Sequence, residues 1–242
     1  MKLYILGCMG PYPEKDCALS GYLIESQNAK VLIECGSGVL AQLQKHTEIK
    51  RLEALILTHL HFDHISDVFV LKYYCATHNL KLDVYMPQED SLEYRLISSM
   101  PEFNVIHIDD GKDIKIKDLN INFIEMVHPK KTLGVKISDG QVILAYTGDT
   151  VLNPNLDILT DGAETVLMDC AYPTELHAPE TPHMSLYQGA KYAQDKPFKL
   201  LVTHIKPEAD IQQELDQLGL VRVYQGDIYK IIQGGYKLKN PR

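Results

Sequence analysis

The chain alternates short apolar runs with segments of helical periodicity over its whole length. Short runs rich in aliphatic side chains are typical of buried strands, whereas apolar residues that recur every third or fourth position indicate helices. Strands are predicted at 3–7, 21–25, 30–34, 54–58, 83–86, 105–108, 121–126, 133–138, 142–147, 165–169, 199–203, 222–224 and 228–232. Helices are predicted at 38–46, 67–78, 88–100, 185–195 and 211–218.

This alternation favours a mixed α/β fold. A hairpin signal at Ser138-Asp139-Gly140-Gln141 occurs beside strand–helix–strand units, so the strands are expected to be partly antiparallel and partly parallel. Two sheets between layers of helices would fit this pattern. No linker, low-complexity tract or charge block interrupts it, and we therefore expect residues 1–242 to form a single domain.

Composition narrows the class of protein. The apolar share of 45% and the charged share of 23% are those of a soluble globular protein. No apolar stretch is long enough to cross a bilayer. The N-terminal apolar run breaks at Gly7, Gly10 and Pro11, so it lacks the core of a signal peptide. A cytoplasmic location is expected.

Charge and cysteine usage exclude further classes. The net charge of −8, from 24 Lys and Arg against 32 Asp and Glu, opposes extended nucleic-acid binding but leaves room for a small anionic substrate drawn by metal ions. The odd number of cysteines and the lack of a Cys-x-x-Cys spacing argue against a disulfide framework and a thiolate zinc site. Buried, unreactive side chains are expected for Cys8, Cys17, Cys35, Cys75 and Cys170.

The densest chemical signal is a group of metal ligands directly after the predicted strand 54–58. His59, His61, Asp63 and His64 occur within six residues. His59 and His61 can project to one side of an extended backbone, whereas Asp63 and His64 lie at the turn into a helix and can face a second point nearby. The alternative to a metal site is a polar loop in which the histidines cluster by chance, and such a loop would not require this particular spacing. The pattern predicts a metal site and favours two ions over one.

Three more candidates follow other predicted strands. His128 precedes Pro129, which would fix the turn that aims it, and His204 ends strand 199–203. Asp149, in Gly148-Asp149-Thr150, is either a turn residue or a carboxylate that bridges two cations. The interpretation that we favour assigns His59, His61 and His128 to one ion and Asp63, His64 and His204 to the other, with Asp149 shared.

This set of motifs, in this order, resembles the signature of the metallo-β-lactamase-fold hydrolases. The segment 32–38 also resembles the first motif of that family, except that Glu34 stands where the family usually has Asp. The resemblance implies a four-layer αββα sandwich with a dinuclear site at one edge of the two sheets. Zinc is favoured by the resemblance, whereas histidine and carboxylate ligands suit zinc, manganese and iron alike.

Downstream residues narrow the resemblance to one branch. The segments 166–170 and 181–185 resemble the phosphodiesterase branch that includes the tRNA-processing nuclease RNase Z. The resemblance implies that His183 protonates the leaving alkoxide and that Asp169 orients His183 and raises its pKa. The alternative is that His183 merely precedes Ser185, the N-cap of a helix. Asp63 is counted as a catalytic residue as well as a ligand.

Two departures separate the chain from RNase Z itself. The interval between His128 and Asp149 holds a hairpin but not the long arm that grips tRNA, and the net charge is acidic. We therefore expect a dinuclear metal-dependent phosphodiesterase that acts on small or cyclic phosphodiesters through a water activated at the metals. Asp149, where B1 β-lactamases carry Cys, argues against antibiotic hydrolysis.

Two alternatives stay open. One is acyl hydrolysis of a lactone, thioester or ester at the same site, and the other is a metal-stabilised binding module without turnover. The expected partner is a small phosphodiester or ester, with no membrane. The oligomeric state is left open, a homodimer included.

Overall fold

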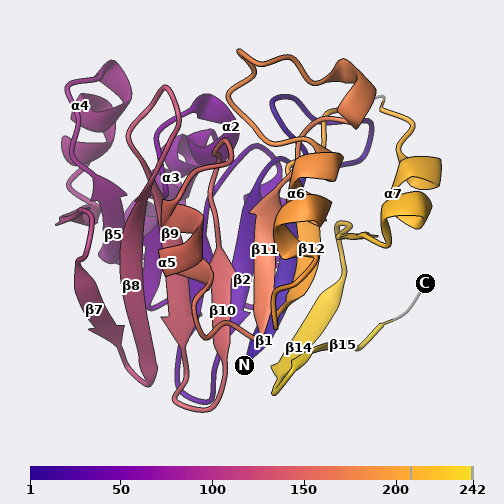
Figure 1. The fold of residues 1–242 in the computed structure, drawn as a ribbon. Coiled ribbons are helices and arrows are strands. Elements are labelled where there is room, and N and C mark those ends of the chain that lie inside the picture. The colour runs from indigo at the N-terminus through magenta and orange to yellow at the C-terminus, as the bar shows by residue number, and fades with distance from the viewer. Residues whose placement is uncertain (208, 241–242) are drawn as a thin grey trace.

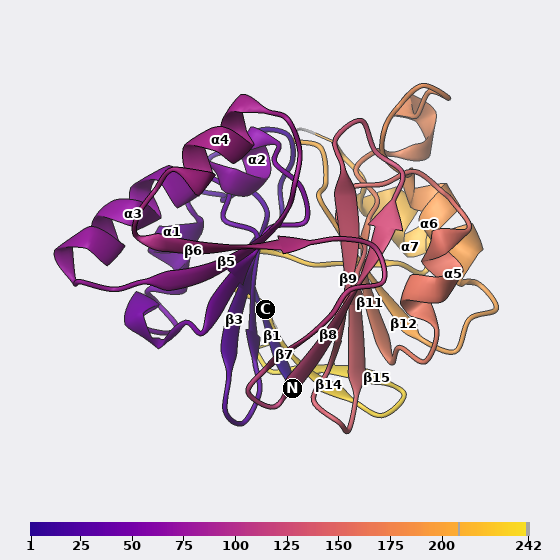
Figure 2. The same ribbon diagram turned by 90° about the vertical axis from the view of Figure 1, so that its left-hand side faces the viewer.

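The computed structural model describes residues 1–207 and 209–240. Two β-sheets pack face to face, and helices cover the outer face of each sheet (Figures 1 and 2). The predicted αββα sandwich is thereby confirmed. Among the described residues, no helix is long and apolar enough to span a membrane.

The first sheet has eight strands in the order β15-β14-β1-β2-β3-β4-β5-β6. Its strands are β1 (Lys2–Gly7), β2 (Gly21–Glu25), β3 (Lys30–Ile33), β4 (Ala54–Ile56), β5 (Leu82–Pro87), β6 (Phe103–Ile108), β14 (Ile228–Ile232) and β15 (Gly235–Leu238). Its outer face carries α1 (Val39–Leu43), α2 (Phe62–Ile65), α3 (Val68–Thr77) and α4 (Leu92–Ser98) (Figure 2).

The second sheet has seven strands in the order β13-β12-β11-β10-β9-β8-β7. Its strands are β7 (Asp113–Ile116), β8 (Leu119–Met126), β9 (Thr132–Ser138), β10 (Ile143–Tyr146), β11 (Thr165–Asp169), β12 (Lys199–Thr203) and β13 (Val221–Arg222). Its outer face carries α5 (Asn155–Thr160), α6 (Leu186–Ala193) and α7 (Gln212–Leu218) (Figure 1).

Three apolar clusters hold the four layers together. One lies between the sheets and includes Ile5, Phe123 and Tyr146. A second packs the first sheet against its helices, and a third does the same for the second sheet. Burial of this apolar surface is the main favourable contribution to folding. None of the five cysteines forms a disulfide, and Cys8, Cys35, Cys75 and Cys170 are buried as predicted. The prediction is wrong for Cys17, which is partly exposed.

Most predicted elements form, with differences at their ends. The helix predicted at 88–100 begins only at Leu92, because Ser91 adopts an extended conformation and its side chain caps the Tyr94 amide. The helix predicted at 38–46 ends at Leu43, and the strand predicted at 222–224 ends at Arg222. The short elements α2, α5, β7 and β15 had not been predicted.

Candidate metal centre

The candidate ligands follow strands whose carboxyl ends meet at one edge. In the second sheet, β9 is antiparallel to both β8 and β10, and β10, β11 and β12 are mutually parallel, so β8, β10, β11 and β12 all point the same way. In the first sheet, β4 lies parallel to β3 and β5. The loops after these strands bring the predicted residues together between the two sheets.

The first predicted ligand set converges as expected. Ligand atoms of His59, His61, His128 and Asp149 all lie within 4.8 Å of one another. The Nδ1 atom of His61 lies 3.1 Å from His59 Nε2 and 3.1 Å from His128 Nε2. Three imidazole nitrogens thus face one point, with a carboxylate oxygen beside them, which is an arrangement that can hold a divalent cation.

The second predicted set converges beside it and shares Asp149. Ligand atoms of Asp63, His64, Asp149 and His204 also lie within 4.8 Å of one another. The Asp149 Oδ2 atom lies 3.3 Å from both His64 Nε2 and His204 Nε2, and 3.5 Å from His59 Nε2 of the first set. Asp149 therefore sits between the two sets, where a bridging carboxylate is needed.

Hydrogen bonds behind the cluster orient its histidines. His59 Nδ1 lies 3.1 Å from Thr58 Oγ1, and that hydroxyl donates to the buried carboxylate of Glu34. Glu34 Oε1 also lies 3.4 Å from His64 Nδ1. Glu34 thus supports ligands of both sets, which accounts for an acidic residue at this point of the first motif.

Contacts from distant segments orient two more ligands. His128 Nδ1 donates to the carbonyl oxygen of Pro182 at 3.0 Å, and His204 Nδ1 lies 3.1 Å from Ser20 Oγ. Each contact leaves the Nε2 atom free to face the cluster. Sequence reasoning missed both partners, because Ser20 lies 184 positions from His204 and carries no motif of its own.

The ionisation of the first set suits cation binding. Burial lowers the pKa of His59 far below its usual range, and neighbouring histidines lower it further. Burial also lowers the pKa of His128 to about 4 and reduces the pKa of His61. All three side chains are therefore neutral near pH 7, the form whose nitrogen lone pair binds a metal.

The second set carries an excess of negative charge. Burial alone would lower the pKa of His64, but Asp149, Asp63 and Glu34 raise it well above its usual range. Burial alone would raise the pKa of Asp149, yet His204, His64 and His59 hold it well below its usual range. Carboxylates that keep a proton on a buried histidine can exchange that proton for a cation.

Unpaired buried atoms provide a separate test of whether these residues fit a metal. Asp149 Oδ1 and His64 Nε2 are buried and have no hydrogen-bond partner among the described residues. Because buried polar atoms are nearly always hydrogen-bonded, these atoms indicate a missing ligand at this point. Imidazole nitrogens and carboxylate oxygens fit divalent zinc, manganese or iron.

The predicted Asp169–His183 pair lies against the same cluster. His183 Nδ1 donates to Asp169 Oδ2 at 2.8 Å, and the His183 ring lies 5.2 Å from that of His128 and 5.1 Å from that of His204. Burial alone would lower the pKa of His183, but Asp169 raises it to about 9. Cations held at the neighbouring ligand sets would oppose this rise through charge repulsion.

Backbone contacts fix the Asp169 carboxylate in place. Its Oδ2 atom also accepts from the Thr150 amide at 3.0 Å, and its Oδ1 atom accepts from the Ala171 amide at 3.2 Å. After His183, Ser185 caps α6 in a capping box with Gln188. The N-cap alternative for this segment therefore describes Ser185 correctly, and it coexists with the Asp169–His183 hydrogen bond.

The remaining histidines lie outside the ligand sets, as expected. His46 packs against Tyr4, His78 stacks on Tyr74, and His107 Nε2 lies 2.6 Å from the Tyr94 hydroxyl. His177 belongs to the segment between β11 and α6 that also carries His183, and its Nε2 donates to the His183 carbonyl at 3.1 Å. The ring of Tyr172 lies 6.0 Å from His183, whereas Tyr187 is exposed on α6.

Comparison with known sequences assigns the family. Residues 29–205 match the sequence model of the β-lactamase superfamily domain. The chain belongs to the β-lactamase superfamily. Within it, the chain is 24% identical to the probable metallo-hydrolase YhfI of Bacillus subtilis over 212 residues, 85% of this chain and 87% of that protein. It is 30% identical to the uncharacterized protein Rv1339 of Mycobacterium tuberculosis over 226 residues, 86% of this chain and 81% of that protein.

Solved structures of superfamily members share the fold. The crystal structure of YhfI has a TM-score of 0.88 at 23% identity and covers 94% of this chain and 97% of its own. The short form of human tRNase Z has a TM-score of 0.76 at 16% identity, with 95% and 99% covered. A diphosphatase from the PhnP family has a TM-score of 0.75 at 17% identity, with 96% and 98% covered. The protein is a metallo-hydrolase of this superfamily with a His/Asp cluster that could bind metal ions.

Proposed function

We propose that the protein is a dinuclear metal-dependent phosphodiesterase that acts on small or cyclic phosphodiesters. Its metal ligands would be His59, His61, Asp63, His64, His128, Asp149 and His204, with His183, Asp169 and Asp63 as catalytic residues. The observation that carries this proposal is the 2.8 Å hydrogen bond from His183 Nδ1 to Asp169, with the His183 ring beside both ligand sets.

Each residue has a defined task in this reaction. Two divalent cations, for which zinc is favoured, would supply Lewis-acid stabilisation of the phosphoryl oxygens and acidify a water molecule. His183 binds Asp169 through Nδ1, so its Nε2 is available to give a proton to the departing alkoxide oxygen. Asp169, held by two backbone amides, keeps the His183 ring oriented and stabilises its protonated form.

The proton donor favours phosphodiester over acyl chemistry. Hydrolysis of an alkyl phosphodiester expels a poor leaving group that needs a proton, whereas acyl transfer depends mainly on an oxyanion stabiliser. The pair formed by buried Asp169 and partly exposed His183 serves the first requirement. The names of the tRNase Z and PhnP-family structures, a ribonuclease and a diphosphatase, support phosphate-containing substrates.

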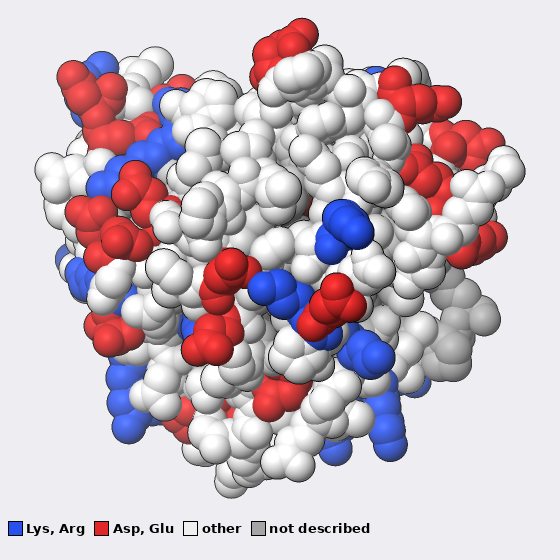
Figure 3. All heavy atoms as spheres, in the orientation of Figure 1, with Lys and Arg blue, Asp and Glu red and all other residues white. Residues whose placement is uncertain are grey.

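The size of the substrate is inferred from the same region. The interval between His128 and Asp149 forms only the hairpin of β9 and β10, which leaves no long arm there to grip an RNA. Figure 3 shows no continuous basic patch on the face that it displays, in keeping with the net charge of −8. Both features support a compact substrate rather than an extended polyanion.

The test compares two classes of ester on protein reconstituted with zinc or manganese. Bis(p-nitrophenyl) phosphate and p-nitrophenyl acetate release the same product, so their hydrolysis is read at one wavelength. We expect turnover of the phosphodiester that is abolished in Asp149→Ala. Asp157→Ala serves as the matched control, because Asp157 pairs with Lys196 at the surface.

Three outcomes would contradict the proposal. Hydrolysis of the acetate alone would assign an acyl hydrolase. Equal phosphodiesterase activity in the wild type and Asp149→Ala would exclude a shared carboxylate. Bound metal without turnover of either ester would indicate a binding module.

A further inference from the structure

The side chains of the candidate metal centre differ in their exposure to solvent. His59, His64, His204 and Asp149 are buried. His61, His128 and His183 are partly exposed. A substrate therefore reaches the cluster over the second group of side chains.

Apolar side chains flank this opening where ordinary surface loops carry polar ones. Phe62 directly follows His61 and is 60% exposed, and Val127 directly precedes His128 and is 53% exposed. The ligand nitrogens of His61 and His128 are only 3.1 Å apart. Because consecutive Cα atoms are about 3.8 Å apart, the backbones of Phe62 and Val127 lie next to those of two ligands that meet at the opening.

Two leucines extend this surface. The Val151 amide donates to the Val127 carbonyl at 3.2 Å and so places Leu152, 49% exposed, beside Val127. The Lys130 ammonium contacts Glu93 at 3.4 Å, so the start of α4, where Leu92 is 58% exposed, lies near the loop that carries Val127. We call Phe62, Leu92, Val127 and Leu152 the apolar rim.

The views of the whole molecule agree with this placement. Figure 2 shows α2 and α4 at the same end of the molecule, where the ligand-bearing strands finish. In Figure 3, the upper centre of the displayed face, over the loops that follow the second-sheet strands, is mostly uncharged. Several exposed apolar side chains next to a catalytic group are typical of a ligand-binding site.

We propose that the apolar rim binds a flat, uncharged group of the substrate, so that the protein selects phosphodiesters that carry an aromatic or heterocyclic arm. This inference rests on the proposed phosphodiesterase function and adds the chemical class of the non-leaving arm. Phe62 offers a ring for stacking, and the aliphatic side chains offer area to bury. The cation next to the rim, Lys130, is compensated by Glu89 and Glu93, which favours an uncharged arm over an anionic one.

The test uses two phosphodiesters that share p-nitrophenolate as leaving group and differ only in the other arm, benzyl or methyl. The measured quantity is the ratio of kcat/KM for the benzyl ester to that for the methyl ester. Any change at the metal ligands affects both esters and cancels in this ratio. We expect a ratio of about ten in the wild type, from burial of one aromatic ring on the rim.

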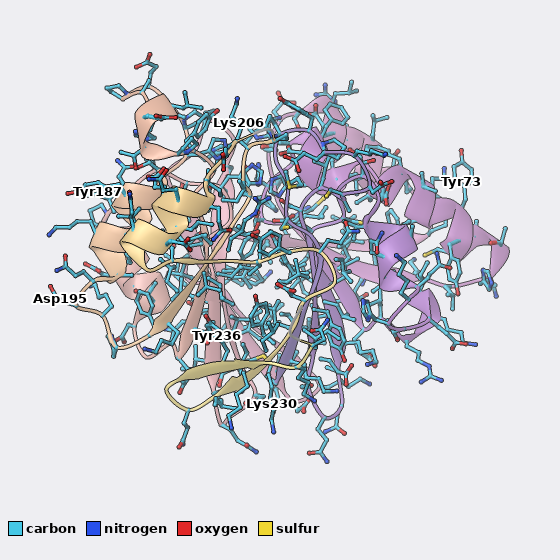
Figure 4. The ribbon with its side chains drawn as sticks, turned by 90° about the vertical axis from the view of Figure 1, so that its right-hand side faces the viewer. Tyr73, Tyr187, Asp195, Lys206, Lys230 and Tyr236 are labelled. Atoms are coloured by element: carbon cyan, nitrogen blue, oxygen red, sulfur yellow. The ribbon has the colours of Figure 1, made fainter. Side chains whose placement is uncertain are left out.

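Two rim variants and one control sharpen the comparison. Phe62→Ser and Leu92→Ser are each expected to bring the ratio towards one, and Leu92 is not adjacent in sequence to any ligand. Tyr73→Ser is the matched control, because Tyr73 is an aromatic residue that is 64% exposed on α3. Figure 4 shows Tyr73 at the outer edge of the molecule, far from Lys206, which follows the ligand His204 by two residues. Tyr73→Ser should leave the ratio at its wild-type value.

A binding measurement separates this inference from the proposed function. Calorimetric titration with benzyl phosphate and methyl phosphate reports on the rim without turnover. Benzyl phosphate should bind more tightly than methyl phosphate, and Phe62→Ser should remove this difference. If neither ester is hydrolysed but benzyl phosphate still binds more tightly, the result excludes the phosphodiesterase function and supports the rim as a binding site for an aromatic group.

Other results would overturn the inference about the rim. A wild-type ratio near one, with both esters hydrolysed, would leave the phosphodiesterase function intact and exclude an aromatic subsite. An unchanged ratio in both rim variants would have the same meaning. If Phe62→Ser instead converts a dimer to a monomer in light scattering and leaves the ratio unchanged, the rim is an interface between copies of the chain.

Discussion

At the scale of single residues, the Asp169–His183 pair is where the chemistry of the site becomes specific. Many hydrolytic reactions could use the seven candidate ligands, but a histidine that is held by a buried carboxylate and faces the cluster suits the expulsion of an alkoxide. The ionisation of His183 depends on Asp169, because burial alone would favour the neutral ring.

Replacing His183 should affect substrates according to their leaving groups. In His183→Ala, kcat for a cyclic phosphodiester with an alkoxide leaving group should fall by about 10²- to 10⁴-fold, the usual contribution of a general acid. The loss should be much smaller for bis(p-nitrophenyl) phosphate, because p-nitrophenolate departs without a proton. Steady-state kinetics on both substrates checks this, with His107→Ala as a control outside the site. Equal losses on both substrates would mean that His183 acts through structure alone.

The hydroxyl of Ser20 contacts a candidate ligand from outside the metal centre, and replacing Ser20 tests whether this contact matters. Ser20 Oγ lies 3.1 Å from His204 Nδ1 and fixes which ring nitrogen faces the cluster. Ser20→Ala should weaken metal binding by about 10- to 100-fold, as loss of such partners commonly does. Competition with a chromophoric chelator measures this affinity. Ser99→Ala, at an exposed serine that bonds only its own helix, should bind metal like the wild type. Unaltered affinity in Ser20→Ala would exclude the orienting role.

At the scale of elements, apolar runs and caps predicted which strands and helices form better than they predicted where each element begins and ends. The strands at 21–25, 165–169, 199–203 and 228–232 form with the predicted bounds, because each has a short core-facing group of apolar residues. The short elements α2, α5, β7 and β15 escaped prediction. They span too few residues to show a period, and tertiary contacts determine their conformation.

A charge network across β1, β2 and β3 shows how neighbouring strands determine stability. Glu25 lies opposite both Lys2 and Lys30 in the sheet and contacts them at 2.7 and 2.6 Å. Burial alone would raise the pKa of Glu25, but the hydrogen bonds from Lys2, Lys30 and Tyr4 lower it from 4.5 to about 2. The folded state therefore binds this proton less readily than the unfolded chain does.

The pH dependence of stability follows from the lowered pKa of Glu25 in the folded state. The contribution of Glu25 is fully present above its unfolded pKa near 4.5 and is lost as the pH falls towards about 2. Glu25→Gln should therefore lower the free energy of unfolding at pH 7 by about 1 kcal/mol or less, and the difference should shrink below pH 4.5. Urea unfolding of both proteins between pH 7 and 3 measures this difference. A difference that stays constant over this range would contradict the assignment.

At the scale of the whole molecule, the candidate centre joins the two sheets. Residues 59–64 follow β4 of the first sheet, whereas His128, Asp149 and His204 follow strands of the second. Cations bound at both sets would hold the sheets together at this edge. The cluster without cations carries excess carboxylate charge, so metal binding and folding should be linked.

Metal removal should therefore destabilise the fold. At free metal concentrations a thousandfold above Kd, binding adds about 4 kcal/mol to stability, and a chelator should remove this increment and lower Tm. Asp149→Ala should show a much smaller difference between metal and chelator, because both ligand sets lose their shared oxygen. Differential scanning calorimetry with and without chelator decides this. The same chelator shift in both proteins would place the metal elsewhere.

Three features of the whole molecule were expected from the chain. The αββα architecture is confirmed, and the β-lactamase superfamily accounts for it. A single domain over residues 1–242 and a cytoplasmic location remain predictions. The metal ligands and the catalytic roles of His183 and Asp169 also remain predictions, although the structure brings all of these side chains together.

The sequence by itself determined which side chains could form a metal centre. Histidine and aspartate ligands are recognisable by chemistry and by local spacing, as in His59 to His64. Only the tertiary structure decided what surrounds them: the contact of Ser20 with His204, the Pro182 carbonyl on His128, and the exposure of Phe62 and Val127 at the opening. These partners are far apart in the chain and have ordinary residue types, so no local pattern distinguishes them before the two sheets pack.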